Sequence, residues 1–288
     1  MSGTPLDRAA LAKHPLPPVG DGDKHEHGRL LIVAGGRELG GAALLCATAA
    51  MRAGAGKLKI ATAATVAPHI GVAMPESRSI ALEEDEDGGL ASSAVDALAA
   101  LVGDVDAVVA GPGMSESSAC SALASAVLKS EAAAALDAGV LRSLPPVEAD
   151  AKAAARPPIL LPHAGEMAAL LGCEEEEVEA EPIACGRRCA ERYHAVTLVK
   201  GVISHVVTPD GQCWTHEGGA PGLGVSGSGD VLAGIVGGLL ARGAEPLGAL
   251  LWSVWMHGEA GARLGRKVGP IGFLARELTD EIPALLPR

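Results

Sequence analysis

Short runs of apolar residues alternate along this chain with longer segments in which apolar and small residues recur at helical spacing. Residues 29–34 form one such run, which ends in Gly35-Gly36 and is followed by a helical pattern over 40–53. This unit of strand, glycine turn and helix recurs along the chain. Strands that are apolar throughout are typical of a parallel sheet with both faces covered. The pattern therefore predicts an α/β fold with a mostly parallel central sheet and helices on both faces.

The same periodicity assigns an element to most of the sequence. We expect strands at 29–34, 57–62, 78–82, 106–110, 132–137, 159–162 and 196–199, and a hairpin of 203–207 and 212–215 around Pro209-Asp210-Gly211. We expect helices at 40–53, 66–70, 90–101, 117–128, 167–171, 174–193, 231–241, 247–256 and 273–286. The acidic residues 83–87 are interpreted as a solvated loop, and 145–158 as a surface connection.

Composition limits both the core and the ligands. Hydrophobic residues make up 48% of the 288-residue chain, but only one Tyr, one Phe and three Trp are present. The core must therefore be built from Ala, Val, Leu and Ile packed at short backbone distances. The formal charge of −12 argues against a nucleic-acid surface, because phosphate backbones are bound mostly by clustered Lys and Arg. An anionic ligand would have to be held locally, by backbone amides and a few cations.

The chain is expected to form a single domain over 1–288, with 1–22 as an N-terminal extension. Its start lacks the apolar run of a signal peptide, and the apolar stretches 231–241 and 247–256 are each too short to span a bilayer. The six cysteines include no CxxC pair, so neither a disulfide framework nor a zinc site is indicated. These features predict a cytoplasmic protein without a membrane partner.

A glycine-rich loop near the C-terminus is the strongest candidate for chemistry. Gly222-Leu-Gly-Val-Ser-Gly-Ser-Gly-Asp230 leads directly into an apolar helical run. Backbone N–H groups at such a helix start, together with the helix dipole, favour bound anions. A carboxylate beside a phosphate is repulsive unless it handles a proton or a metal ion, which makes Asp230 the first catalytic candidate. The alternative is an ordinary helix start with a first-turn acid.

Two common nucleotide-binding motifs are not supported by the sequence. Residues 222–227 satisfy GxGxxG, but they follow no convincing strand and lack the βαβ continuation of a dinucleotide-binding unit. A Walker A loop is also absent, because Gly56-Lys57 is followed by Leu58. Polar residues instead punctuate the predicted strand ends, at Gly35-Gly36, 111–113, Asp137, 163–166, Lys200-Gly201 and 222–230. In a parallel sheet all of these lie at one edge, where ligands bind.

The order of these motifs resembles the ADP/ATP-dependent NAD(P)H-hydrate dehydratases of the ribokinase-like superfamily. The resemblance covers most of the chain and rests on residues 28–36, Gly41-Ala42-Ala43, 52–56, Gly111-Pro112-Gly113, 162–166, Leu198-Val199-Lys200-Gly201 and 221–234. It implies a ribokinase-like fold and repair of hydrated NADH or NADPH, with ADP (or ATP) as phosphoryl donor and Mg²⁺. It also implies an NAD(P)H-hydrate epimerase as a functional partner and a homo-oligomer.

The resemblance assigns roles residue by residue. Asp230 would take the proton of the substrate hydroxyl, and Ala42, Gly113 and His163 would contact the hydrated dinucleotide. The nucleotide would be bound by Lys200, Gly201, Val202, Ile203, Ser204, Gly227, Ser228 and Gly229. Glu166 would orient a Mg²⁺-bound water or a neighbouring donor, and His257 is interpreted as a core or supporting residue.

The chain departs from the family pattern in four places. Ala164 replaces a proline, Gly139 replaces a second aspartate after Asp137, Ser226 replaces a frequent glycine and Val225 a frequent threonine. Taken without the family, His163 suits a helix-start histidine and Lys200 a surface corner of the hairpin. Lys24, His25 and His27 are interpreted as a solvated loop, with a lid contact as the alternative.

Two other functions stay open from the sequence. A small-molecule kinase of the same superfamily, acting on a vitamin precursor or a sugar, would use the same aspartate and anion loop. A non-catalytic nucleotide-binding protein would keep the fold without the reaction.

Overall fold

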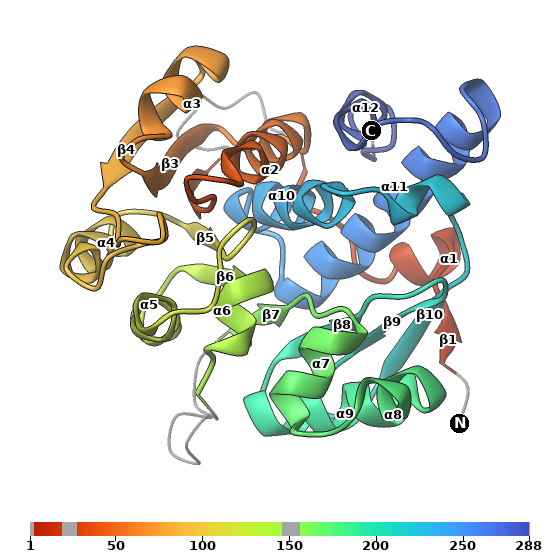
Figure 1. Cartoon of the computed structure of the whole chain (residues 1–288). Helices are drawn as coiled ribbons and strands as arrows, with labels where there is room; N and C mark the ends of the chain where they lie inside the picture. The colour runs from red at the N-terminus through yellow and green to blue at the C-terminus, as the bar shows by residue number, and fades with distance from the viewer. Residues whose placement is uncertain (1–2, 19–27, 146–155, 288) are drawn as a thin grey trace.

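The structure is a computed structural model that describes residues 3–18, 28–145 and 156–287 (Figure 1). They form one ten-stranded sheet in the order β1-β10-β9-β8-β7-β6-β5-β2-β3-β4. The strands are β1 (Thr4–Pro5), β2 (Arg29–Val33), β3 (Lys57–Ala63), β4 (Ser77–Leu82), β5 (Ala107–Ala110), β6 (Ala133–Leu136), β7 (Ile159–Leu160), β8 (Val196–Val199), β9 (Ser204–Val207) and β10 (Cys213–His216). Among these strands β9 alone is antiparallel to its neighbours, so the prediction of a mostly parallel sheet is confirmed.

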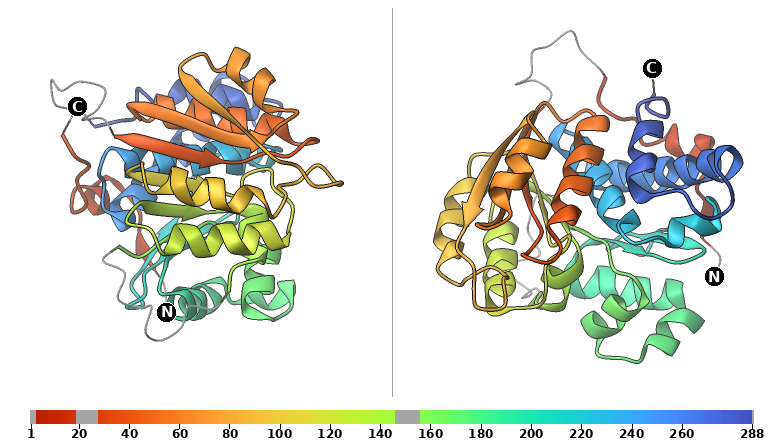
Figure 2. Two further views of the ribbon diagram at one scale, coloured as in Figure 1. Left: turned by 90° about the vertical axis from the view of Figure 1, so that its left-hand side faces the viewer. Right: turned by 45° about the horizontal axis from the view of Figure 1, so that its top comes forward.

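Helices cover both faces of the sheet. They are α1 (Arg8–Leu11), α2 (Gly40–Arg52), α3 (Ala67–Ala73), α4 (Ala94–Val102), α5 (Ser118–Leu128), α6 (Ala138–Arg142), α7 (Ala164–Leu171), α8 (Glu175–Ala180), α9 (Pro182–Tyr193), the 3₁₀ turn η2 (Pro221–Gly224), α10 (Ser228–Ala241), α11 (Pro246–Lys267) and α12 (Ala275–Glu281). Seen from the side of α4 and α5, the sheet lies between these two helices in front and the blue C-terminal helices behind (Figure 2).

The side chains of β2 alternate between two cores. Leu30 and Ile32 belong to the core shared with α2, α10 and α11, whereas Leu31 and Val33 face the core shared with α4, α5 and α7. All four side chains are fully buried. A strand that is apolar at every position is thus explained by helices on both of its faces.

The strand order reverses between β2 and β5. The chain runs outward from β2 to β3 and β4, and then returns to β5, on the other side of β2, before continuing to β8. The loops that follow the carboxyl ends of β2 and β5 therefore run in opposite directions along the edge of the sheet. Such a reversal point is where ligands bind in open α/β sheets.

Glycines on α10 allow unusually close packing. A Cβ at Gly234 would lie 2.2 Å from the carbonyl oxygen of Cys46 on α2, and one at Gly238 would lie 2.5 Å from that of Ala50. On an adjacent face of the helix, a Cβ at Gly237 would lie 2.4 Å from Val109 on β5. The predicted core of small residues at short backbone distances is confirmed, and it fixes the height of α10 above the sheet.

Several predicted boundaries were wrong. The helix predicted over 174–193 is two helices, because Glu181 leaves helical geometry and Pro182 starts α9. The helix predicted over 247–256 continues to Lys267, and the one over 90–101 begins only at Ala94, since Leu90 pairs with Glu84 in an isolated bridge. The helix predicted over 167–171 starts already at Ala164, and the closing helix is shorter than 273–286.

The N-terminal extension joins the fold, which the sequence did not indicate. Thr4–Pro5 pairs in parallel with β10, and the guanidinium of Arg8 lies 5.2 Å from the ring centroid of Trp255 on α11. Lys24, His25 and His27, and most of the predicted connection 145–158, lie outside the described residues. In the part of the chain that is described, no helix is both long and apolar enough to cross a membrane.

Candidate active site

The glycine-rich loop ends at the first turn of α10. Gly227 is the N-cap residue and has a φ of 89°, in the left-handed region that favours glycine. A Cβ there would also lie 2.5 Å from Leu45 on α2. The first intrahelical bond runs from the N–H of Val231 to the carbonyl of Gly227, so helix geometry leaves the N–H groups of Gly229 and Asp230 without intrahelical acceptors. These two groups are available to an anion, as predicted for this loop.

Asp230 occupies the first turn of α10 and is half-buried. Burial, reinforced by the negative charge of Asp137 and opposed by Lys200, raises the pKa of Asp230 to about 6. A carboxylate with a pKa near the working pH is suited to accept and release a proton. The aspartate therefore has the electrostatic environment that a general base requires.

Lys200 is held between two carboxylates from other elements. It follows β8, and its Nζ donates to Oδ1 of Asp137 at 2.9 Å and lies 3.7 Å from Oε2 of Glu166. Both carboxylates are buried. Burial alone would lower the pKa of Lys200, but the charges of Asp137 and Glu166 outweigh it and raise that pKa. Lys200 is thus a charged, paired lysine at the sheet edge, not a surface corner.

His163 caps α7, as a helix-start histidine does. Its Nδ1 accepts from the N–H groups of Gly165 (3.1 Å) and Glu166 (3.4 Å), while the Glu166 carboxylate accepts from the N–H of His163 (2.9 Å). Because Nδ1 is an acceptor, the neutral ring carries its proton on Nε2. The imidazole is 53% exposed, so it retains a surface for a ligand.

His257, on α11, contacts the first turn of α10. Its Nε2 lies 3.0 Å from the hydroxyl of Ser228 and 3.1 Å from the Ser228 carbonyl oxygen. Burial lowers the pKa of His257 to about 4, so the ring is neutral at physiological pH. A neutral ring in this place supports the loop, which agrees with its interpretation as a supporting residue.

A cavity with a volume of about 1050 Å³, here called the larger cavity, lies beside the start of α10. One wall is formed by the loop between β8 and β9 together with the first residue of β9. This wall supplies five of the eight residues predicted to bind the nucleotide: Lys200, Gly201, Val202, Ile203 and Ser204. Ser228 and Gly229 line the same cavity, as does His163. The structure therefore brings seven of the eight predicted nucleotide-binding residues and one predicted substrate residue to a common space, whereas Gly227 and Asp230 are not among the residues that line this cavity.

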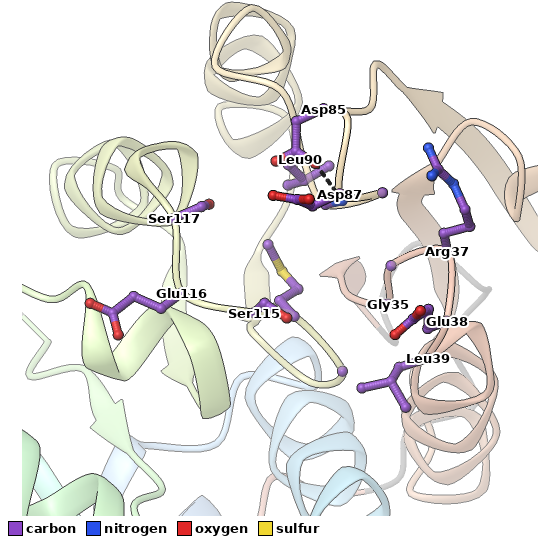
Figure 3. A pocket seen from close by; sticks show the side chains of 15 residues that line it. Gly35, Arg37, Glu38, Leu39, Asp85, Asp87, Leu90, Ser115, Glu116 and Ser117 are labelled. Atoms are coloured by element: carbon purple, nitrogen blue, oxygen red, sulfur yellow. Dashed lines mark hydrogen bonds between the residues drawn. The ribbon is translucent and has the colours of Figure 1, made fainter.

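The smaller cavity, of about 190 Å³, lies over the point where the strand order reverses (Figure 3). Its walls come from the loops after β2 and β5 and from the turn 85–90. Gly113 lines it, with a φ of 66°, and a Cβ there would lie 2.5 Å from the Cβ of Ala42. The two small residues predicted to contact substrate are thus direct neighbours.

The acidic residues 83–87 are largely exposed, as expected of a solvated loop, but the turn they form is also anchored, which the sequence did not indicate. Arg37 Nη2 donates to Glu84 at 2.9 Å, and the N–H of Arg37 donates to the carbonyl of Gly88. The turn is thereby fixed to the loop after β2 and forms a wall of the smaller cavity, with Asp85 and Asp87 as lining residues. The adjacent Gly88-Gly89 was the only local signal, because Arg37 and Glu84 are far apart in sequence.

The structure adds His216 to the wall of the larger cavity, a residue that no sequence pattern singled out. Its ring is packed between two glycines, since a Cβ at Gly218 or Gly258 would lie 2.5 or 2.2 Å from its Nε2. Within the described residues Nε2 has no hydrogen-bond partner, and burial lowers the pKa of this imidazole.

Gly139, where the family pattern has a second aspartate, is required by packing in this chain. A Cβ there would lie 2.4 Å from the carbonyl oxygen of Met114. In residues 3–18, 28–145 and 156–287, no three His, Cys, Asp or Glu side chains converge as a metal site.

A family model for NAD(P)H-hydrate dehydratase matches residues 30–284 of this sequence. The chain belongs to the NAD(P)H-hydrate dehydratase family. The ADP-dependent (S)-NAD(P)H-hydrate dehydratase of Xanthomonas campestris is 46% identical over 97% of this chain and 95% of its own length. The bifunctional NAD(P)H-hydrate repair enzyme Nnr of Moorella thermoacetica is 34% identical over 92% of this chain, which spans about half (50%) of that longer protein.

Solved structures agree with this membership of the NAD(P)H-hydrate dehydratase family. The Bacillus subtilis ADP/ATP-dependent NAD(P)H-hydrate dehydratase, co-crystallised with ATP and Mg²⁺, has a TM-score of 0.84 and 28% identity, covering 99% of this chain and 98% of that one. A ribokinase-like protein from Enterococcus faecalis has a TM-score of 0.81 at 20% identity, covering 98% and 95% of the two chains. The predicted ribokinase-like fold is confirmed.

Proposed function

We propose that this protein restores NADH and NADPH from their hydrated forms, with ADP as phosphoryl donor. The observation that carries the proposal is the position of Asp230 in the first turn of α10, where two N–H groups lack intrahelical acceptors. This half-buried carboxylate has a pKa of about 6, and the charge of Lys200 acts on it. The family relative that is 46% identical carries this activity in its name. The substrate would contact Ala42, Gly113 and His163.

The reaction needs an activated leaving group, because hydroxide leaves a carbon poorly. In the first step the hydroxyl of the hydrated ring attacks the terminal phosphorus of ADP while Asp230 takes its proton. The bond between that phosphorus and the bridging oxygen breaks, and AMP departs with the electron pair. The N–H groups of Gly229 and Asp230 and the ammonium of Lys200 stabilise the charge on the transferring oxygens.

In the second step the new ester collapses. The carbon–oxygen bond of the ring breaks, phosphate leaves with the electron pair, and a proton leaves the neighbouring carbon so that the ring double bond re-forms. The net change is hydrated dinucleotide plus ADP to reduced dinucleotide, AMP and phosphate. Positioning and charge stabilisation are the main contributions required of the protein.

Nucleotide binding is assigned to the larger cavity. The loop from Lys200 to Ser204 would lie along the donor, and Gly227, Ser228 and Gly229 would hold its phosphates. Val202 is 98% exposed at the rim, and an apolar side chain left open at that point suits cover by the base or ribose. Magnesium carried in by the phosphates would supply further charge neutralisation, and Glu166 would orient one of its waters.

We also propose that the protein acts as a single cytoplasmic domain and as a homo-oligomer, and that it works alongside an NAD(P)H-hydrate epimerase. The bifunctional relative supports the last point, because its name covers repair by one longer chain of which this sequence spans about half.

The deciding experiment mixes purified protein with hydrated NADH and either ADP or ATP, and follows the recovery of the reduced-nicotinamide absorbance. We expect recovery with release of phosphate, and a loss of about 10²–10⁴-fold in turnover for Asp230→Asn. Accumulation of a phosphorylated alcohol with ATP would instead identify a small-molecule kinase. Nucleotide binding without turnover of any substrate would identify a non-catalytic protein.

A further inference from the structure

Asp137 is a buried carboxylate that the proposed reaction does not use. It follows β6, is 3% exposed, and makes its closest ionic contact with Lys200, two strands away at the end of β8. Burying a carboxylate is costly unless a partner compensates it. A pair placed at the ligand edge of the sheet, and not at a subunit core, calls for a reason other than stability.

The backbone around Asp137 is held rigidly. A Cβ at Gly111 would lie only 1.8 Å from the carbonyl oxygen of Asp137, so the turn after β5 packs directly on this residue. The next residue, Ala138, has a φ of 47°, which is uncommon for alanine. Gly139 is pressed against Met114 in the same way. The main chain that carries the carboxylate is thus fixed by close contacts, and the side-chain partner of Asp137 is Lys200 at 2.9 Å.

The ion pair with Asp137 holds the Lys200 ammonium near the start of α10. A Cβ built on Gly229 would lie 3.8 Å from Lys200 Nζ, and the charge of Lys200 acts on Asp230. A lysine side chain has four rotatable bonds, so without a fixed partner its ammonium would sample much of the larger cavity. Glu166, at 3.7 Å, limits the ammonium from a second direction.

We propose that Asp137 is a positioning residue, which holds the ammonium of Lys200 where the phosphoryl group is transferred. The inference rests on the proposed function. In this arrangement a protein cation, already paired and charged before the nucleotide arrives, stands at the point where charge develops. A preorganised cation costs no rearrangement during the reaction, whereas a mobile one does. Asp137 acts through Lys200 and does not touch the substrate.

The test is a double-mutant cycle of Asp137→Asn and Lys200→Met in the full chain. We expect Asp137→Asn to lower kcat by roughly 10–100-fold, with a smaller change in the KM for ADP, because misplacing a catalytic group by about 1 Å can cost that much. In the Lys200→Met background, Asp137→Asn should cause no further loss. If the losses in kcat of the two single variants instead multiply in the double variant, the proposal is overturned, because Asp137 would then act independently of Lys200.

The pH profile supplies a readout that a merely structural role would not move. The negative charge of Asp137 raises the pKa of Asp230 and the positive charge of Lys200 lowers it. Asp137→Asn should therefore shift the acid limb of kcat/KM to lower pH, and Lys200→Met should shift it to higher pH. If the acid limb of the kcat/KM profile is unshifted in both variants, the proposal is overturned.

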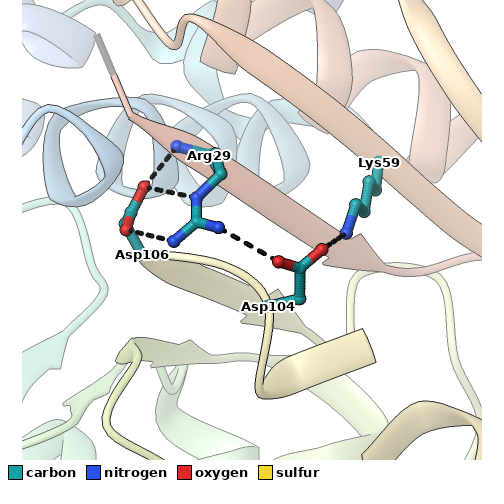
Figure 4. Close-up of polar contacts among 4 residues, drawn as sticks. All are labelled: Arg29, Lys59, Asp104 and Asp106. Atoms are coloured by element: carbon teal, nitrogen blue, oxygen red, sulfur yellow. Dashed lines mark hydrogen bonds and ion pairs between the residues drawn. The ribbon is translucent and has the colours of Figure 1, made fainter. Parts of the chain in front are cut away.

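The matched control is Asp106→Asn at the opposite end of the sheet (Figure 4). Asp106 also pairs with a cation, at 3.0 Å from Arg29, but it precedes β5, at the amino end of the strands. Asp106→Asn should leave kcat and the acid limb of the kcat/KM profile unchanged. If Asp137→Asn alone does not fold, the double variant, which removes both charges, still allows comparison with Lys200→Met.

Failure of the proposed function can be distinguished from failure of this inference. The double-mutant cycle of Asp137→Asn and Lys200→Met can also be measured in ADP affinity by calorimetry, which does not require the dehydration reaction. If the wild-type protein binds ADP but restores no NADH, the proposed function fails, and the cycle in ADP affinity still decides whether Asp137 acts through Lys200. Independent losses of affinity in the two variants would overturn the inference in that case as well.

Discussion

The Ser228 hydroxyl lies 3.0 Å from Nε2 of His257, and this contact ties the start of α10 to α11. The same ring nitrogen lies 3.1 Å from the Ser228 carbonyl oxygen. Ser228 is the first residue of α10, two positions before Asp230. The position of the proposed base therefore depends on a neutral histidine on a different helix.

His257 should make the protein less stable in acid. Burial lowers its pKa from 6.5 to about 4 in the folded chain, so between these values the unfolded chain binds the proton more readily. Stability then falls as the pH is lowered through this window. Melting temperatures at pH 7 and pH 5 should differ less for His257→Gln, which does not titrate, than for wild type. An equal acid loss in both proteins would contradict this.

Asp230 should cost stability when it is ionised. Its folded pKa of about 6 lies above the ordinary value of 3.8, so the folded chain binds the proton more readily and stability falls as the pH rises through this range. Asp230→Asn should therefore raise the melting temperature at pH 8 by ~2–4 °C although it lowers turnover. The gain should vanish at pH 4, where the carboxyl is protonated in the folded chain. A variant that is less stable than wild type at pH 8 would refute the assignment.

The same pKa sets the pH dependence of activity. Below pH 6 the wild-type kcat/KM should fall by about tenfold per pH unit, because the protonated acid cannot accept the substrate proton. The residual activity of Asp230→Asn should show no such limb. A wild-type profile that is flat from pH 5 to pH 8 would argue against Asp230 as the base.

The sequence was sufficient for the architecture because strands buried on both faces carry an unbroken apolar signature. It also placed the polar residues at one sheet edge, since parallel strands deliver their carboxyl ends together. It could not pair Asp137 with Lys200, which are 63 positions apart and bear no local pattern that links them. Contacts of this kind depend on the strand order, which periodicity does not reveal.

Long-range packing also explains why α11 continues to Lys267, beyond the end that was predicted for it. The helix was predicted to end at Met256 because the apolar stretch ends there, and the glycines that follow would weaken an isolated helix. In the structure Gly258 makes room for His216, and Gly261 for Leu223, where a Cβ would lie 2.2 and 2.6 Å from those side chains. The glycines are there for neighbours that are distant in sequence, and the helix continues through them.

Close packing of α10 on α2 predicts a position at Gly234 that is sensitive for stability. Gly234→Ala would place a methyl group 2.2 Å from a backbone carbonyl, which side-chain motion cannot relieve. We expect a loss of about 1–3 kcal/mol in unfolding free energy, measured by urea denaturation. Gly41→Ala, in a helix where an added Cβ meets nothing within 4 Å among the described residues, is the matched control and should not destabilise the protein. Equal effects of the two substitutions would show that packing is not the cause.

Gly113 offers a test of the substrate side that is separate from nucleotide binding. Its φ of 66° and the 2.5 Å approach of an added Cβ to Ala42 mean that Gly113→Ala both strains the backbone and fills the space beside Ala42. Gly172 has nearly the same φ, 68°, but an added Cβ there meets nothing within 4 Å in the described part of the chain. Gly172→Ala therefore reproduces the strain, which costs about 1 kcal/mol, without the collision. We expect Gly113→Ala to raise the KM for hydrated NADH by about tenfold or more and to leave ADP affinity within about twofold, whereas Gly172→Ala should change neither. If Gly113→Ala weakens ADP binding as strongly as substrate binding, the smaller cavity does not belong to the dinucleotide and the division of the site between two ligands is wrong.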